Sequence, residues 1–436
     1  MSFQDIRRRS RKWFSAEEIR LLVFVLLGLA VLLAANISLA RILPGGEWLY
    51  LRWSGARAFL FEQVEPYSTT IAERVQQVVY GRNAFSSEYS YVLNDPFYIV
   101  LLYTPLAVLP EFASIFFRSF SQSLYFPLAR GVWMLFAEGA LVGSVTFAIR
   151  LSEWEPPRWM LISLIGFSIF GYFSLNSLIS NSPTIFLLFL YLSILLALRS
   201  FNDELAGALL VLAAYQWEVG GLFFLFVLIF MIANKRWGIL TGFGMSLFVL
   251  LVVSFLSYPG WGLPYFRAAL SGWYRSANLN LDSILSFWFP DSKFSLGAIS
   301  AILLVLIVFI EWLGAVGSHF RRVVWAASLS LAATPLIGFA IFPPNHVVLV
   351  LPLILVIALI WERWHRRRVL AGALALTVAF IVPFILYIFN ATTNERVYSD
   401  LLTLLPPVAA IIALYWMRWQ VVRSSRPWLE QVGARP

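Results

Sequence analysis

"LLVFVLLGLAVLLAANISLARIL", residues 21–43, is the stretch that decides the fold class of this chain. It carries a single charge, at Arg41, and a helix of about 20 apolar residues is long enough to cross a bilayer. Because a signal-peptide core has only about 7–15 apolar residues, we expect a retained anchor. The preceding segment, 1–20, is rich in arginine, so the positive-inside rule predicts that the N-terminus is cytoplasmic.

The composition extends this interpretation to the whole chain. Of the 436 residues, 60% are hydrophobic and 13% are charged, about half of the roughly 25% typical of soluble domains. The net charge of +9 does not indicate nucleic acid, because much of it sits in short clusters beside apolar runs. With no cysteine, disulfides and thiolate metal sites are excluded. The sequence predicts an all-α, polytopic membrane protein.

Further apolar runs follow the first, separated by short polar breaks. Several are shorter than a full crossing needs, so they must extend into polar residues or mark broken helices. Together with the anchor they give about 12 spans in one transmembrane domain, residues 21–417, followed by a tail at 418–436. The runs are 129–151, 159–173, 184–198, 205–217, 221–233, 238–257, 296–316, 323–342, 347–361, 369–389 and 401–417.

The positive-inside rule divides the breaks into two groups. The breaks predicted to be cytoplasmic carry clustered arginine or lysine and lie at 150–158, 199, 235–236, 321–322, 363–368 and after 418. The breaks predicted to face outward lie at 44–95, 174–182, 217–220, 258–296, 343–346 and 390–400. Both termini are then cytoplasmic, and a plasma (inner) membrane is the expected location.

Two outer segments are long. The second, 258–296, is rich in Trp, Tyr, Pro and Gly, so we expect a loop that rests on the lipid headgroups, whereas the first, 44–95, is expected to form amphipathic helices at the interface. In the first, apolar residues recur at near-helical spacing around Trp48 and Leu51, with Arg52, Arg57 and Glu62 between them. The stretch 97–109 is short and contains Pro105, so we interpret it as a juxtamembrane or re-entrant helix. If it crossed together with 115–126, the count would be fourteen.

Several polar residues in or beside the runs are candidates for function, each with a simpler alternative. Glu47 follows a Pro-Gly-Gly turn just outside the first span, where it is either functional or a solvated helix-start charge. Arg52 and Arg57 either neutralise a phosphate or snorkel to lipid headgroups. Glu138, inside a span, is either functional or joins two helices by a hydrogen bond.

Two further candidates lie at outward-facing breaks. Glu218 lies beside Gly220 and Gly221, in a break that resembles a cavity-lining interrupted helix or a tight turn. His346 is either a phosphate ligand or proton donor, or a lone turn histidine. No histidine pair has metal-ligand spacing, so no metal is expected.

Three stretches, "GGEWLYLRWSGARAFLFEQVEPYS", "NDPFYIVLLYTPLAVLP" and "LARGVWMLFAEGALV", resemble the N-terminal region of glycosyltransferase family 87. These are GT-C-type membrane enzymes that use polyprenyl-phosphate sugars, typically mannose. "LISNSPTIFLLFLYLSILLALR" and the segment 205–237 are similar to the family's middle section, and the match covers roughly the first 260 residues. The family tends to show Asn-Gly-Gln and Lys-Pro where this chain has Ser180-Asn181-Ser182 and Gln216-Trp217-Glu218.

The resemblance implies a function and a site. The family's aspartate after the first transmembrane helix is replaced by Glu47, which would act as the catalytic base while a hexose passes to a lipid or glycan acceptor with inversion. Arg52, Arg57 and His346 would meet the leaving phosphate. The other residues that would bind donor or acceptor are Asp95, Tyr98, Asn181, Gln216, Glu218 and Asn345.

Two alternatives remain open. The chain could be a catalytically inactive relative that binds a lipid or partner protein, since two family motifs are altered. A transporter or flippase would also have many spans and broken helices, but would predict an inverted repeat and midplane charges. The expected partners are membrane lipids, a polyprenyl-phosphate sugar as co-substrate and its acceptor. No cofactor is expected.

Overall fold

The computed structural model describes residues 16–85, 88–116, 121–275, 280–393 and 395–422. Throughout these residues the regular secondary structure is helical, which confirms the predicted all-α class. Segment 1–15, which holds most of the arginine-rich N-terminus, and most of the tail, 423–436, lie outside the described residues.

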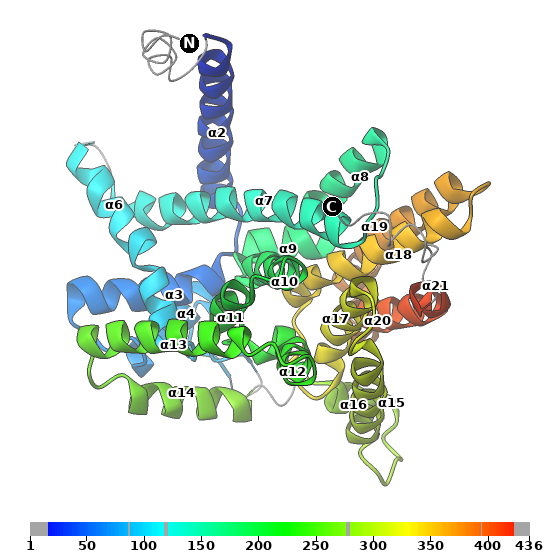
Figure 1. Cartoon of the computed structure of the whole chain (residues 1–436). Coiled ribbons are helices and arrows are strands. Elements are labelled where there is room, and N and C mark those ends of the chain that lie inside the picture. The colour runs from blue at the N-terminus through cyan, green and yellow to red at the C-terminus, as the bar shows by residue number, and fades with distance from the viewer. Residues whose placement is uncertain (1–15, 86–87, 117–120, 276–279, 394, 423–436) are drawn as a thin grey trace.

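The first apolar run forms one long helix, α2 (Ala16–Ile42), which stands out from the rest of the molecule (Figure 1). Only its C-terminal half packs, through a stripe that includes Leu33, Asn36 and Ala40, against α7 (Tyr125–Leu151). Within this contact Asn36 donates a 3.1 Å hydrogen bond to Glu138. Glu138 therefore joins two helices, the simpler of its two predicted roles.

The outer segment after α2 folds into a compact group of short helices. It contains α3 (Glu47–Arg57), a π-helical turn (Ala58–Glu62), α4 (Thr69–Tyr80), α5 (Phe97–Leu102) and α6 (Thr104–Phe116). The helix predicted around Trp48 and Leu51 is thus present, but α3 is buried on nearly all sides, including at Arg52. These helices share an apolar cluster that is separate from the main core and includes Leu49 and Phe97.

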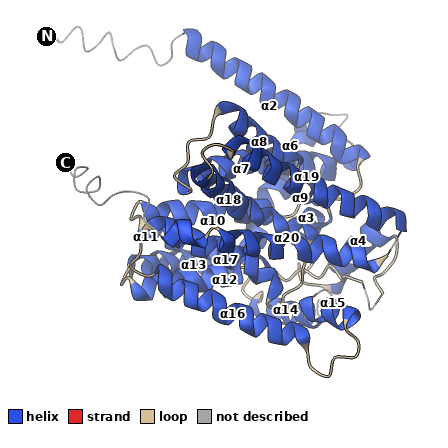
Figure 2. Cartoon of the chain, turned by 90° about the vertical axis from the view of Figure 1, so that its right-hand side faces the viewer, coloured by secondary structure: helices blue, strands red, loops and turns tan. Residues whose placement is uncertain are grey.

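The other helices form the body of the molecule. The central one is α18 (Val350–Arg363), which packs against α7 and α17 (Phe320–Ala333) and belongs to the apolar segment Pro343–Arg363, 83% of which is buried. The elements are η2 (Gln122–Leu124), α8 (Arg158–Phe170), α9 (Tyr172–Ser180), α10 (Thr184–Arg199), α11 (Asp203–Ala213), α12 (Trp217–Ala233), α13 (Gly238–Ser257), α14 (Gly262–Arg275), α15 (Leu281–Trp288), α16 (Leu296–Ala315), α17 (Phe320–Ala333), η4 (Thr334–Leu336), η5 (Pro343–Leu349), α18 (Val350–Arg363), α19 (Arg368–Thr393), α20 (Arg396–Trp416) and α21 (Arg418–Val422). Figure 2 shows how these helices pack around the centre.

By length and composition, eight helical segments of the described chain can cross a membrane, or nine if α8 and α9, bent by 45°, make one span. Each of the twelve predicted runs contains a helix, but α10, α11, α12 and α17 are only 16, 11, 17 and 14 residues long. The chain is thus a multi-pass helical protein. The full count of about twelve crossings stays a prediction.

The segment Phe97–Phe116 is one of these eight, and it contains the stretch 97–109 that was interpreted from sequence as juxtamembrane or re-entrant. It is broken at Tyr103 between α5 and α6. Arg57 of α3 and Tyr125 at the start of α7 both bond to Glu111 in α6. The last turns of α6 therefore lie beside α3 and the first turn of α7.

Contacts between the breaks follow the two groups that the charge pattern predicts. At one end, the ion pairs are Arg199–Glu153, Arg236–Asp203, Arg321–Glu362 and Arg418–Glu311. At the other, the hydrogen bonds are Ser177–Pro344, Thr184–Asn345, Tyr258–Glu65 and Trp288–Asp400. We call these the arginine-rich end and the opposite end. Asn345, a predicted site residue, takes part in the contacts of the opposite end.

Candidate functional site

The turn before α3 sets the position of Glu47 at the start of that helix. Gly45 and Gly46 have φ of 120° and 86°, a left-handed region that glycine adopts at little cost. A Cβ on Gly45 would lie 2.5 Å from the carbonyl oxygen of Ile179, so only glycine fits this close approach. Gly46 caps α3, and Glu47 is its first residue. A carboxylate is favoured there by the helix dipole.

Arg130 of α7 holds this turn in place. Its guanidinium donates to the carbonyl oxygens of Ala40, Leu43, Pro44 and Ile179, at 2.7–3.3 Å. Its Nε donates to Asn181 Oδ1 at 2.8 Å. Arg130 is 2% exposed, and these bonds occupy its donors. It therefore ties the end of α2 and the turn to the end of α9.

Glu47 itself is half-buried, and its side chain forms no hydrogen bond or ion pair with another residue in the part of the chain that the structure describes. Burial raises the pKa of its carboxyl from the usual 4.5, while its own backbone amide and the charge of Arg130 oppose the shift. A carboxylate that is desolvated and unpaired is a stronger base than a solvated one.

Four aromatic residues, Trp48, Tyr89, Tyr91 and Phe342, form a cluster beside Glu47. The Trp48 ring lies 5.4 Å from Tyr89 and from Phe342, and 6.0 Å from Tyr91. Burial raises the pKa of the Tyr91 hydroxyl, and the nearby Glu47 carboxylate adds to this. The aromatic cluster thus joins α3, the segment before α5 and the turn before η5 next to the unpaired carboxylate.

Arg52 and Asp95, both predicted to bind substrate, bind each other. Arg52 Nε lies 2.6 Å from Asp95 Oδ2, its Nη2 donates to Oδ1 at 3.2 Å, and Nη1 donates to the carbonyl oxygen of Trp48. The two residues are 2% and 3% exposed. Tyr67 donates to the backbone carbonyl of Asp95. The pair fixes α3 to the segment before α5.

Arg57, the other predicted phosphate-binding cation, is also occupied. It pairs with Glu111 at 2.8 Å and donates to the carbonyl oxygen of Ala107. Its guanidinium also lies over the Trp53 ring. Because Arg57 is ten residues beyond Glu47, it lies about 15 Å further along α3. It holds α3 to α6 rather than facing Glu47.

A row of small polar side chains, Asn181, Ser182, Thr184 and Asn345, continues from Arg130 to the turn before α18. Ser182 and Thr184 hydroxyls lie 2.8 Å apart, and Thr184 donates to Asn345 Oδ1 at 3.1 Å. All but Asn345 are at most 5% exposed. Within the described residues, the Asn181 amide nitrogen Nδ2 is buried without an acceptor. We call this row the polar row.

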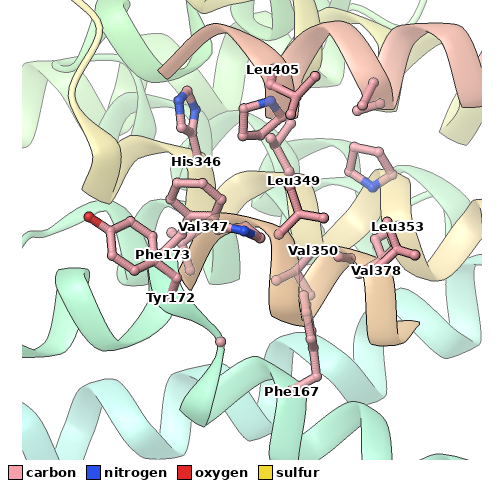
Figure 3. Close-up of a pocket in the computed structure, with 18 of the residues that line it drawn as sticks. Phe167, Tyr172, Phe173, His346, Val347, Leu349, Val350, Leu353, Val378 and Leu405 are labelled. Carbon is pink, nitrogen blue, oxygen red and sulfur yellow. The ribbon is translucent and has the colours of Figure 1, made fainter. Parts of the chain in front are cut away.

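His346 follows the polar row and lies at one end of a cavity of about 440 Å³ (Figure 3). It is 2% exposed, neither ring nitrogen forms a hydrogen bond with a side chain among the described residues, and the backbone of Thr403 lies beside the ring. Phe173 packs edge-on to its ring. Most of the rest of the wall is apolar and includes Phe167, Leu353 and Val378. The cavity is therefore apolar with one polar end.

The remaining predicted residues divide between core and site. Tyr98 is buried in the apolar cluster of α3 and α5. Gln216 caps α12, and its buried Oε1 has no partner in the described chain. Glu218 lies near Tyr89. Burial is the main reason that the pKa of the Tyr89 hydroxyl is raised, and the charge of the nearby Glu218 raises it further. Glu218 thus belongs to the surroundings of the aromatic cluster.

The structure links Glu47 and Asn181 through Arg130, and the polar row continues to Asn345, which precedes His346 in the chain. Neither Arg130 nor the aromatic cluster was predicted from the sequence. An arginine at the start of an apolar run was the available signal for Arg130, since such a charge must find partners. In the described residues, no group of three acidic or histidine side chains could hold a metal ion. No protein-family model and no curated protein matches this chain.

Proposed function

We propose that this protein is a membrane glycosyltransferase that moves a hexose from a polyprenyl-phosphate donor to a lipid or glycan acceptor at the opposite end, facing away from the cytoplasm. The observation that carries the proposal is the unpaired, half-buried Glu47 with a raised pKa, held by Arg130 beside an aromatic cluster. Aromatic faces suit the apolar C–H faces of a sugar, and a desolvated carboxylate suits proton removal.

The apolar cavity supports a lipid-linked donor. Its walls come from α8, α9, α18, α19 and α20, and its volume of about 440 Å³ is in the usual range for small-molecule sites. An isoprenoid chain needs an apolar channel with a polar exit. His346 supplies that exit, and its sequence neighbour Asn345 begins the polar row that leads toward Glu47.

The leaving phosphate would be met by donors that the fold leaves free. Arg52 and Arg57 are engaged with Asp95 and Glu111, so we assign the phosphate to the Asn181 amide and the His346 ring, whose polar atoms are buried and unpartnered. A buried polar atom without a partner costs about 1–3 kcal/mol, which a bound ligand can recover. The positive charge of Arg130 also favours an anion nearby.

The reaction follows from these positions. Glu47 accepts the proton of the acceptor hydroxyl as its oxygen forms a bond to the anomeric carbon. The bond from that carbon to the phosphate oxygen breaks, and the polyprenyl phosphate leaves with the electron pair. Displacement in one step inverts the anomeric configuration. The apolar surroundings strengthen the hydrogen bonds that stabilise the leaving phosphate.

The test is transfer of radiolabelled sugar from polyprenyl-phosphate mannose in membranes that contain the full-length protein. We expect Glu47→Gln to lower the rate by about 10²–10⁴-fold, the usual contribution of a positioned base. Glu65→Gln, which alters an exposed carboxylate of the same outer segment, is the matched control and keeps the rate. Full transfer by Glu47→Gln, with wild-type protein active, would contradict the base assignment.

A further inference from the structure

A second cavity, of about 850 Å³, lies at the arginine-rich end between α18, α19 and α20. Its mouth carries Arg363, Arg366 and Arg367 on the short turn between α18 and α19, with His365 between them. These arginines are exposed, and none of them forms an ion pair in the described parts of the chain. The adjacent acid, Glu362, is already paired with Arg321.

Below this basic mouth the cavity is lined by hydrocarbon. Leu370, Leu374 and Val378 of α19 are 68%, 61% and 50% exposed and lie on the wall of the groove. From Leu370 to Val378 the helix rises by about 12 Å, close to the roughly 15 Å of one leaflet's hydrocarbon. The groove therefore has the depth of a single lipid leaflet.

Two tryptophans mark the boundary between the basic mouth and the apolar groove. The Trp364 and Trp416 rings pack edge to face at 5.4 Å, and both line the cavity. The guanidinium of Arg363 lies 5.7 Å from the centre of the Trp416 ring. Tryptophan rings prefer the headgroup level of a bilayer, because one edge is polar and the rest is apolar.

From this arrangement we propose that the groove between α18, α19 and α20 binds one anionic diacyl phospholipid. The phosphate lies on Arg363, Arg366 and Arg367, and an acyl chain follows α19 past Leu374. Charge selects the ligand, since several cations face the mouth without a carboxylate to neutralise them, while a zwitterionic headgroup would add an unmatched positive charge. The proposal does not depend on sugar transfer, because this site lies at the end remote from Glu47.

The experiment is native mass spectrometry of the full-length protein in neutral detergent, with phosphatidylglycerol and phosphatidylcholine added at equal concentration. We expect one phosphatidylglycerol to be retained in preference to phosphatidylcholine. The triple variant Arg363→Gln, Arg366→Gln, Arg367→Gln should bind it about a hundredfold more weakly. Arg150→Gln, Arg158→Gln, Lys235→Gln removes the same charge at the same end, outside the cavity, and should bind as the wild type does.

A second variant separates a bound lipid from general attraction to the basic surface. Leu374→Trp keeps every charge but fills the groove, and Leu374 does not line the first cavity. We expect this variant to lose the retained lipid. Equal retention of both lipids, equal loss in the two triple variants, or wild-type binding by Leu374→Trp would each overturn the proposal.

Discussion

Removing the charge of Asp95 tests how the site is held together. In Asp95→Asn, Arg52 keeps its bond to the Trp48 carbonyl but loses its counter-charge, with both residues at most 3% exposed. A buried ion left without its partner costs about 3–5 kcal/mol, whereas a surface pair is worth less than about 1 kcal/mol. Because the pair is buried, the larger figure applies. The free energy of unfolding should fall by about 3–5 kcal/mol.

Equilibrium unfolding of the purified protein in mixed neutral and anionic micelles measures this change. The double variant Arg52→Met, Asp95→Leu is the key comparison, because replacing both charges by apolar groups is often close to neutral. We expect the double variant to be more stable than Asp95→Asn by at least about 2 kcal/mol. A loss below about 1 kcal/mol in Asp95→Asn, or a double variant as unstable as the single one, would refute the buried-pair reasoning.

Three further predictions concern the residues around Glu47 and the first cavity. Because burial raises the Glu47 pKa, the folded state binds more protons than the unfolded state just above pH 4.5, and the free energy of unfolding falls as pH rises through that window. Glu47→Gln should remove this decline and unfold at a higher temperature than wild type at pH 7, which thermal scans at pH 4 and pH 7 would record. Gly45→Ala forces a Cβ against Ile179 at a positive φ, so it should lower the free energy of unfolding by more than about 1 kcal/mol, while Gly166→Ala, where a Cβ meets open space, should not. Leu353→Trp fills the apolar cavity and should raise KM for a polyprenyl-phosphate sugar several-fold with little change in unfolding temperature; an unchanged KM would remove the donor chain from this cavity.

Local features of the fold could be predicted from sequence because they depend on short-range patterns. Apolar length and breaks located the helix α2 and the turn at Gly45–Gly46, and charge sign grouped the breaks into two ends. Helix lengths were less predictable. The run 205–217 becomes α11, which is only 11 residues long. The end of a buried helix depends on the helices that pack against it, here α10 and α13, and not on hydropathy alone.

The site was harder to predict, because its geometry depends on partners that are far apart in the chain. Arg52 and Asp95 are 43 residues apart, and Arg130 reaches carbonyls 86–90 residues away. The near-helical spacing around Arg52 suggested that it either neutralises a phosphate or snorkels to lipid headgroups, yet a single carboxylate from another segment allows it to be buried. Glu47 and His346 were recognisable because each polar group stands alone at the end of an apolar run.

The most direct test of the central claim is a structure of the protein with a non-hydrolysable polyprenyl-phosphonate sugar bound. We predict the sugar against the aromatic cluster, the phosphonate near Asn181 and His346, and a Glu47 oxygen within about 2.6–3.2 Å of the acceptor hydroxyl or of a water in its place. A sugar bound at the arginine-rich end, or a Glu47 carboxylate directed away from the bound sugar, would contradict the account.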